Sequence, residues 1–269
     1  MKIALIQQFA SQDIKLNLQR GLEAARLACE NGANLIVFPE LAFTPFYPQN
    51  RLSGSRFQFT ETIPGPTTDV FCKLAKQKNV VIVLNLYERD GDAAFDSSPI
   101  IDADGSILGV TRMIHITQYD GFFEQDYYDP GDTGAPVYDT AVGRIGIAIC
   151  YDRHFPEYMH SLGKQKADIV LIPQAGTAGE WPEGVFEAEV QASAFQNGYF
   201  AALANRVGAE EVLTFAGGSF VTNPRGQVLA KAPEGIEHIL YQDLNLDEVA
   251  ASPARTLFFE HARPGLFVG

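Results

Sequence analysis

Two polar side chains with reactive chemistry stand just beyond apolar runs of this 269-residue sequence. Glu40 comes two residues after the run Leu35–Phe38, and Cys150 follows the run Arg144–Ile149. Continuous apolar runs are typical of strands buried on both faces, and the carboxyl ends of such strands collect functional groups at one edge of a sheet. A buried carboxylate has a raised pKa and can take a proton from a thiol. The pattern therefore predicts Glu40 as a general base and Cys150 as a nucleophile.

The chain around Cys150 is expected to turn from a strand into a helix that begins near Pro156. Backbone N–H groups at such a turn favour a thiolate over a thiol. A third polar segment, Pro173–Gly176 with Gln174, follows another apolar run in the same way. A single cysteine after a strand is more often structural than catalytic, and a Pro-Glu pair is usually a turn. Their combination in this order favours catalysis.

Strands and helices alternate along the chain, and hairpin signals join some of the strands. We therefore predict a mixed sheet within an α/β fold and one domain spanning residues 1–269, with a C-terminal tail from about residue 248 that packs on the body or on a partner subunit. The predicted strands are Ile3–Gln7, Leu35–Phe38, Val80–Leu84, Ser98–Asp102, Ile107–Ile116, Ile145–Ile149, Ile169–Pro173, Tyr199–Leu203, Phe220–Thr222 and Val228–Ala230. The first predicted helix is stopped by Asn31-Gly32, and the others cover Thr67–Lys78, begin at Pro156 and cover Pro182–Gln196.

The composition is that of an ordinary globular protein, with 46% hydrophobic and 20% charged residues. A formal net charge of −13 argues against nucleic acid or an anionic membrane as the main partner. The three cysteines form no close pair, which fits a reducing compartment. With no signal-peptide core and no apolar stretch near the roughly 20 residues of a membrane span, we expect a cytoplasmic protein.

Several separate blocks resemble the signature blocks of the nitrilase superfamily of carbon–nitrogen hydrolases. They are Phe38–Leu41, Tyr127–Asp132 and Cys150–Glu157, and the similarity extends over nearly the whole chain. The resemblance implies a four-layer-forming α-β-β-α sandwich that assembles as a homodimer or higher homo-oligomer. It also implies that no metal and no organic cofactor takes part.

The same resemblance implies a Glu–Lys–Cys triad and a second, supporting glutamate. By motif, Glu40 is the general base, Cys150 the nucleophile and Glu124 the supporting carboxylate, and the backbone N–H of Tyr151 helps to hold the oxyanion. Cys150 would attack an amide, carbamoyl or nitrile carbon, release ammonia or an amine, and leave a thioester for water to hydrolyse.

The chain departs from this pattern at the lysine. The family segment has the form Arg-Lys-x-His, whereas Arg112–His115 places Met113 at the lysine position. Losing one oxyanion donor typically costs about 2.7–4 kcal/mol of transition-state stabilisation. In a strand His115 would share the face of Met113 and could donate if protonated, while Arg112 would need a bulge to reach the site.

Three alternatives remain open for the chain as a whole. It is a natural subgroup with a modified oxyanion site, a weakened or engineered form of a lysine enzyme, or a catalytically silent relative that binds a small molecule or serves in an assembly. The presence of Glu40, Glu124 and Cys150 favours an active hydrolase. A papain-like Cys–His enzyme is a weak alternative, because no histidine has a distinct case as the base.

The segment Tyr127–Gly134 is similar to that of the amidase and N-carbamoyl amine or amino-acid hydrolase branches. True nitrilases carry a tryptophan in this block, and the only tryptophan here is Trp181. We therefore expect a small amide or carbamoyl substrate rather than a nitrile. Candidate substrate-binding residues are Tyr47, Gln174 and Glu180.

Overall fold

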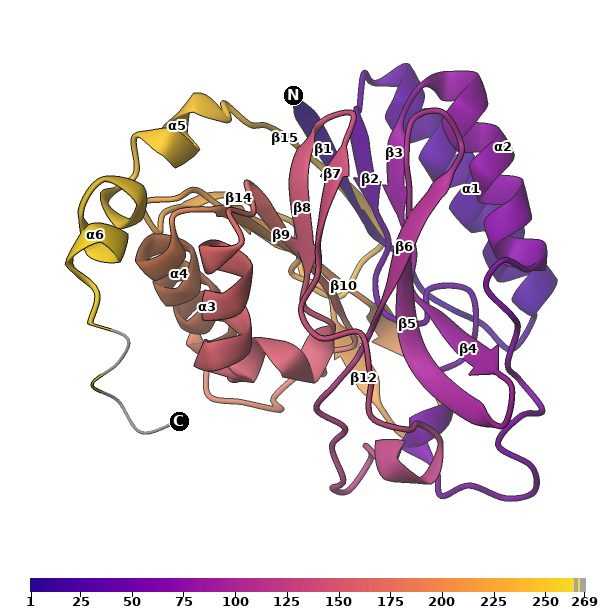
Figure 1. The fold of residues 1–269 in the computed structure, drawn as a ribbon. Coiled ribbons are helices and arrows are strands. Elements are labelled where there is room, and N and C mark those ends of the chain that lie inside the picture. Colours follow the sequence, from indigo (N-terminus) through magenta and orange to yellow (C-terminus); the bar gives the residue numbers. More distant parts are fainter. Residues whose placement is uncertain (264–265, 267–269) are drawn as a thin grey trace.

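Two β-sheets face each other, and each carries two helices on its outer side (Figure 1). The structure is a computed structural model and describes residues 1–263 and 266. The first sheet has the order β15-β1-β2-β3-β5-β4, with β6 paired to β5, and the second has the order β14-β13-β10-β9-β8-β7. This arrangement confirms the predicted α-β-β-α sandwich.

Parallel strands occupy the centre of both sheets, and antiparallel strands flank them. The first sheet contains β1 (Lys2–Gln7), β2 (Leu35–Val37), β3 (Val81–Val83), β4 (Leu86–Asp90), β5 (Ala93–Ile101), β6 (Ile107–Arg112) and β15 (His238–Asp243). The second contains β7 (Val137–Thr140), β8 (Gly143–Ile147), β9 (Ile169–Gln174), β10 (Phe200–Asn205), β13 (Phe220–Thr222) and β14 (Val228–Lys231), and β11 (Val207–Ala209) pairs with β12 (Thr214–Ala216) in a separate ribbon.

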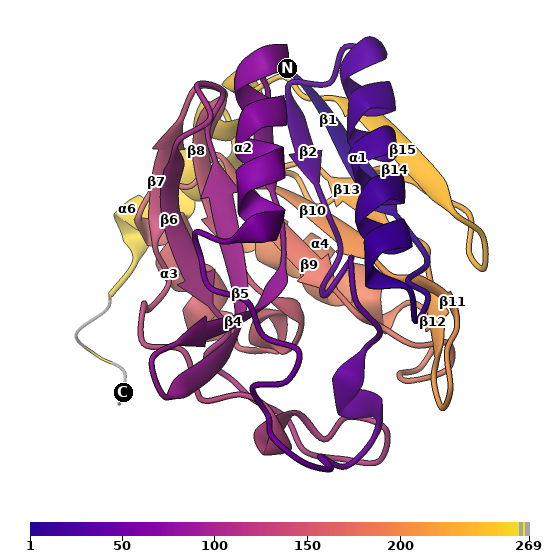
Figure 2. The same cartoon turned by 90° about the vertical axis from the view of Figure 1, so that its right-hand side faces the viewer.

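The helices α1 (Ile14–Glu30) and α2 (Pro66–Lys78) cover the first sheet, and α3 (Pro156–Lys164) and α4 (Val185–Asn197) cover the second. Figure 2 shows α1 and α2 side by side over the first sheet. Three apolar cores result. One lies between the sheets and includes both Cys150 and Met113, and the other two lie beneath the two helix pairs.

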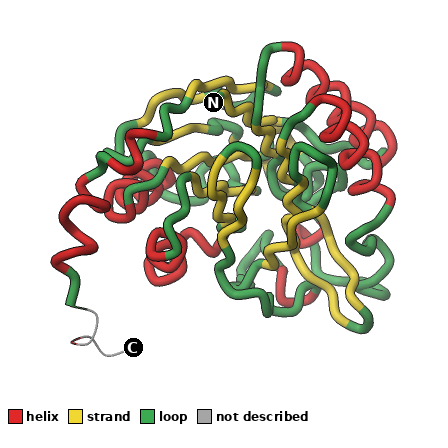
Figure 3. The backbone as a smooth tube through the Cα atoms, turned by 45° about the horizontal axis from the view of Figure 1, so that its top comes forward, coloured by secondary structure: helices red, strands yellow, loops and turns green. Residues whose placement is uncertain are grey.

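The chain after β15 runs along the outside of the second sheet through α5 (Asp247–Ala250), a π-helical turn (Ala254–Phe258) and α6 (Phe259–His261) (Figure 3). Arg255 donates hydrogen bonds to the carbonyl oxygens of Gly163 and Ala167, at 2.9 and 2.8 Å. Of the C-terminal tail predicted from about residue 248, residues 264, 265 and 267–269 lie outside the described part of the chain.

The predicted strand Ile107–Ile116 is too long, because β6 ends at Arg112. The carboxylate of Asp152 accepts hydrogen bonds from the amides of Ile114 and His115, at 3.3 and 3.0 Å, which draws this segment away from the sheet. Within the described residues, no helix is both long enough and apolar enough to span a bilayer.

Candidate active site

Cys150 lies three residues beyond β8, at the start of the short 3₁₀ helix Cys150–His154. Its φ angle is 41°, a left-handed conformation that costs free energy in a residue with a Cβ atom. Its side chain is buried, and its carbonyl oxygen accepts a hydrogen bond of 2.8 Å from Nη1 of Arg153. The neighbouring Tyr151 amide lies in the first turn, where helical N–H groups lack intrahelical partners.

Glu40 is fully buried beyond the end of β2 and precedes Leu41, which also has a positive φ angle, of 44°. The turn is held from two sides. Nη1 of the buried Arg206 donates to the carbonyl oxygens of Glu40, at 3.0 Å, and of Leu41. The Leu41 amide donates to Oδ1 of Asn85 at 2.8 Å. The backbone of the turn is therefore fixed by hydrogen bonds that leave the Glu40 carboxyl group uncommitted.

The Glu40 carboxyl group adjoins both the Cys150 thiol and the carboxyl group of Asp96. Neither carboxylate oxygen of Glu40 forms a hydrogen bond of good geometry in these contacts. Burial, together with the nearby charge of Glu124, raises the pKa of Glu40 to about 8. Burial, Glu40 and Glu124 also raise the pKa of the Cys150 thiol, against the opposing charge of Arg153. The Cys150 thiol and the Glu40 carboxyl group, both with raised pKa values, therefore adjoin each other in a buried site.

Met113 lies opposite Asp96, one residue beyond β6. Its amide donates to the Asp96 carbonyl oxygen at 2.9 Å, which continues the register Ser97↔Arg112. Directly opposed residues of antiparallel strands project to the same face of the sheet. Met113 is fully buried, so its thioether lies on the face of the sheet that carries the Asp96 carboxyl group.

Glu124 is the third fully buried carboxyl group of this region. Its Oε2 accepts a hydrogen bond of 3.3 Å from the Thr117 amide, and its Oε1 has no partner. Burial and the charge of Asp96 raise its pKa well above the ordinary value. The buried hydroxyl of Tyr128 is also without a partner, and the pKa of Tyr128 is raised by burial and by Asp96, Glu40 and Glu124. Glu124 and Tyr128 therefore belong to the same polar cluster as Glu40 and Asp96.

Glu180 stands beside this cluster and accepts hydrogen bonds from Tyr119 and Thr177. The Tyr119 hydroxyl donates to its Oε1 at 2.6 Å, and the Thr177 amide donates to its Oε2 at 3.0 Å. The charges of Glu180 and of Cys150 contribute, after burial, to a raised pKa of the Tyr119 hydroxyl. The structure thus brings the predicted Glu180 close to the nucleophile, through Tyr119.

The two predicted replacement donors are bound elsewhere. Arg112 donates to Glu88, Asp90 and Asp132, with N–O distances of 2.7–3.0 Å. The Nδ1 atom of His115 lies 2.6 Å from Oδ1 of Asp152, and its ring stacks on Phe155 with centroids 3.4 Å apart. Within the described residues neither side chain forms a hydrogen bond with Glu40 or Cys150. Because the strand ends at Arg112, His115 does not repeat the orientation of Met113.

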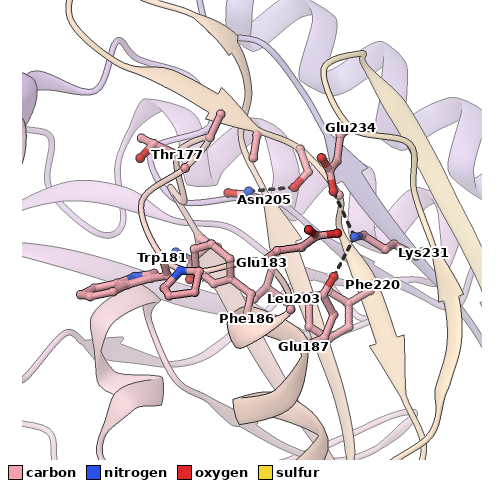
Figure 4. A pocket seen from close by; sticks show the side chains of 18 residues that line it. Thr177, Trp181, Glu183, Phe186, Glu187, Leu203, Asn205, Phe220, Lys231 and Glu234 are labelled. Carbon is pink, nitrogen blue, oxygen red and sulfur yellow. Dashed lines mark hydrogen bonds and ion pairs between the residues drawn. The ribbon is translucent and has the colours of Figure 1, made fainter.

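The other two predicted substrate-binding residues, Tyr47 and Gln174, lie in different surroundings. Tyr47 stacks on Phe59 with centroids 4.2 Å apart. Gln174 is buried, and its Oε1 accepts a hydrogen bond of 2.7 Å from Nη1 of Arg153, the atom that also donates to Cys150. Gln174 also lines a cavity of about 410 Å³, in which Lys231 pairs with two glutamates (Figure 4). Neither Cys150 nor Glu40 is among the residues that line that cavity.

Sequence reasoning missed four residues of the site: Asp96, Tyr128, Arg153 and Arg206. Asp96 is the one with a visible signal, because Asp-Ser-Ser at positions 96–98 interrupts a strand that is buried along almost its whole length. A run of polar residues in such a strand indicates partners from elsewhere in the fold. Within the described residues, no group of three or more His, Cys, Asp or Glu side chains is arranged to hold a metal ion.

Comparison with known proteins places this geometry in a family. The sequence model for "Carbon-nitrogen hydrolase" matches residues 2–254. The chain is 31% identical to an N-carbamoylputrescine amidase of Solanum lycopersicum, covering 98% of this chain and 93% of the relative. It is also 31% identical to a citrullinase of Francisella tularensis, covering 99% and 96%.

Solved structures agree with the sequence relatives. A carbon-nitrogen hydrolase from Helicobacter pylori G27 superposes with a TM-score of 0.92 at 27% identity, covering 99% of this chain and 96% of the other. A mutant of the amidase from Nesterenkonia sp. AN1 superposes with a TM-score of 0.78 at 26% identity, covering 97% and 96%. That structure shows covalent addition of the acetamide moiety of fluoroacetamide at the active site cysteine.

Proposed function

The chain belongs to the carbon–nitrogen hydrolase family, and we propose that it hydrolyses the C–N bond of small linear amides or N-carbamoyl compounds through a thioester on Cys150. The observation that carries the proposal is the contact between the Cys150 thiol and the Glu40 carboxyl group within a fully buried site. The relatives named as N-carbamoylputrescine amidase and citrullinase support linear carbamoyl chemistry.

In the proposed mechanism, the ionised form of Glu40 takes the thiol proton as Sγ of Cys150 attacks the carbonyl carbon. The Tyr151 amide donates to the oxygen on which negative charge develops. Glu40 then returns the proton to the leaving nitrogen, and ammonia or an amine departs. Water, deprotonated by Glu40, attacks the thioester and regenerates the thiol, with Glu124 as the supporting carboxylate.

The raised pKa of Glu40 gives this mechanism a pH dependence. Only the ionised carboxylate accepts a proton, and at pH 7 a group with a pKa of about 8 is mostly protonated. For a neutral substrate we therefore expect kcat/KM to rise with pH and to level off above about 8.

We also propose that the protein acts as a homodimer or higher homo-oligomer.

The test is ammonia release from a panel of small amides and N-carbamoyl compounds, combined with intact mass spectrometry. We expect turnover by the wild type, an acyl adduct on Cys150 at short times, and loss of both in Cys150→Ala. Replacement of the half-buried Cys72 by alanine is the matched control and should leave both signals in place. Turnover that persists in Cys150→Ala would refute the thioester mechanism.

A further inference from the structure

The buried surroundings of Cys150 contain three carboxyl groups. Glu40, Asp96 and Glu124, here called the carboxyl cluster, are all fully buried, and within the described residues no lysine or arginine side chain bonds to any of their carboxyl groups. Both oxygens of Glu40, Oδ2 of Asp96, Oε1 of Glu124 and the hydroxyl of Tyr128 have no hydrogen-bond partner. A buried polar atom without a partner costs about 1–3 kcal/mol. A ligand that supplies several N–H groups and a positive charge would satisfy these atoms.

We infer that this site also hydrolyses cationic C–N compounds, amidines and guanidines, whose own positive charge takes the place of the family's lysine. The inference rests on the proposed roles of Cys150 and Glu40 and extends the substrate class. An amidinium or guanidinium group is planar and presents paired N–H donors, which match carboxylates in bidentate contacts. A neutral amide instead presents a carbonyl oxygen, for which the Tyr151 amide is the proposed donor and Met113 offers no second one.

The chemistry of the attack favours the cation for a second reason. When sulfur adds to a carbonyl, an oxyanion develops and needs donors, and Met113 supplies none. When sulfur adds to an amidinium carbon, the C=N electron pair moves onto nitrogen and the positive charge is neutralised, so that no oxyanion forms. The missing lysine therefore costs the cationic substrate much less than the neutral one.

Each step balances. The Cys150 thiol gives its proton to the Glu40 carboxylate, the S–C bond forms, and the C=N electron pair moves onto nitrogen. Glu40 then protonates one amino group, the C–N bond breaks, ammonia leaves, and a cationic thioimidate remains on sulfur. Water adds to that carbon and the C–S bond breaks, which restores the thiol and yields an amide from an amidine, or a urea from a guanidine. The proton released in hydrolysis is taken up by the ammonia as ammonium.

Charge near the cluster also fits a cation. Glu180 and Tyr119 stand next to the cluster, and the chain as a whole carries a formal net charge of −13. A negative potential at the surface raises the encounter rate of cationic substrates and lowers that of anionic ones.

The test compares isosteric pairs on the wild-type enzyme: acetamidine with acetamide, benzamidine with benzamide, and methylguanidine with methylurea. Ammonia release gives kcat/KM for each compound, and intact mass identifies the adduct on Cys150. We expect kcat/KM for the amidine or guanidine to exceed that of its neutral partner at least tenfold. The adduct should have the mass of a thioimidate rather than a thioester.

Two substitutions change the charge of the site in a defined direction. Met113→Lys adds the family's cation and should lower the amidine-to-amide ratio at least about 100-fold, the scale of one oxyanion donor. Asp96→Asn removes a carboxyl group that a bound cation would keep ionised, with little change of shape, and should lower the ratio at least tenfold. Met113→Leu, which adds no charge, and Asp104→Asn, at an exposed turn, are the matched controls and should keep the wild-type ratio.

A pH profile separates a charge effect from a purely structural one. A bound cation beside Glu40 lowers its pKa, so the acid limb of kcat for benzamidine should lie at lower pH than that of kcat/KM. Neutral partners that are turned over as fast as the cations or faster, with Cys150 required, would overturn this inference and leave the proposed function standing. Absence of turnover and of adducts with every compound would overturn both.

Discussion

Replacing Glu40 by glutamine should stabilise the protein while abolishing the proposed catalysis. The pKa of Glu40 is 4.5 in the unfolded chain and about 8 in the folded chain. Between these two pH values Glu40 is protonated in the folded chain and ionised in the unfolded chain. The free energy of unfolding falls with rising pH wherever the folded state binds more protons. Glu40 therefore destabilises the fold across this window, and a neutral isostere removes the effect.

The magnitude follows from the two pKa values. At about 1.4 kcal/mol per pKa unit, the ionisation of Glu40 on unfolding lowers the free energy of unfolding by about 1 kcal/mol at pH 5 and by about 4 kcal/mol at pH 8. The free energy of unfolding of Glu40→Gln relative to the wild type should therefore increase by about 3 kcal/mol from pH 5 to pH 8. The nearby charge of Glu124 is part of this effect, because it repels an ionised Glu40.

Urea unfolding followed by far-UV circular dichroism at pH 5, 6, 7 and 8 measures this difference. Glu30→Gln, at the exposed end of α1, is the control and should show a difference that does not vary with pH. A gain for Glu40→Gln that stays constant, or that shrinks as the pH rises, would refute the assignment of a proton to Glu40 in the folded state.

Two further predictions concern the same cluster. Met113→Lys should be tolerated, because the new ammonium group lies opposite Asp96. Met159→Lys places an ammonium group in the apolar core beneath α3 and α4, and should lower the free energy of unfolding by at least about 3 kcal/mol more. Urea unfolding of the two variants measures this difference. The rate of alkylation of Cys150 by iodoacetamide should increase as the pH rises through about 8, where Glu40 ionises. In Glu40→Gln the rate should show no inflection at that pH. Intact mass spectrometry over time measures the rate in both proteins.

The positions of Glu40 and Cys150 were predictable because they depend on a simple property of the chain. The strands that precede them are continuous apolar runs, and parallel strands of this kind end at a common edge. The long helices were predictable for the same reason, since each covers one face of a sheet with a regular apolar stripe. The strands that sequence reasoning missed, β4, β7, β11, β12 and β15, lie at sheet edges or in the separate ribbon, where half-exposed side chains give a weak pattern.

The composition of the polar cluster was not predictable, because its members meet only through the sandwich. Asp96 comes from the middle of β5 and Tyr128 from a loop, and no local pattern links either of them to Glu40. The resemblance predicts only that Met113 stands at the position of the family's lysine. The fold adds that an additional carboxyl group, from Asp96, stands opposite that methionine.

The absence of a lysine and the presence of Asp96 change the site in the same direction. The first leaves the site without the family's cation, and the second adds a carboxyl group. Burial and the charge of Glu124 raise the pKa of the base, and burial, Glu40 and Glu124 raise the pKa of the nucleophile. For a neutral substrate the site has two disadvantages: the raised pKa leaves Glu40 mostly protonated at neutral pH, and Met113 offers no donor to the oxyanion. A cationic substrate reverses both effects, because its charge lowers those pKa values as it binds and disappears as the S–C bond forms. The buried carboxyl groups that destabilise the empty fold would then contribute to binding and catalysis.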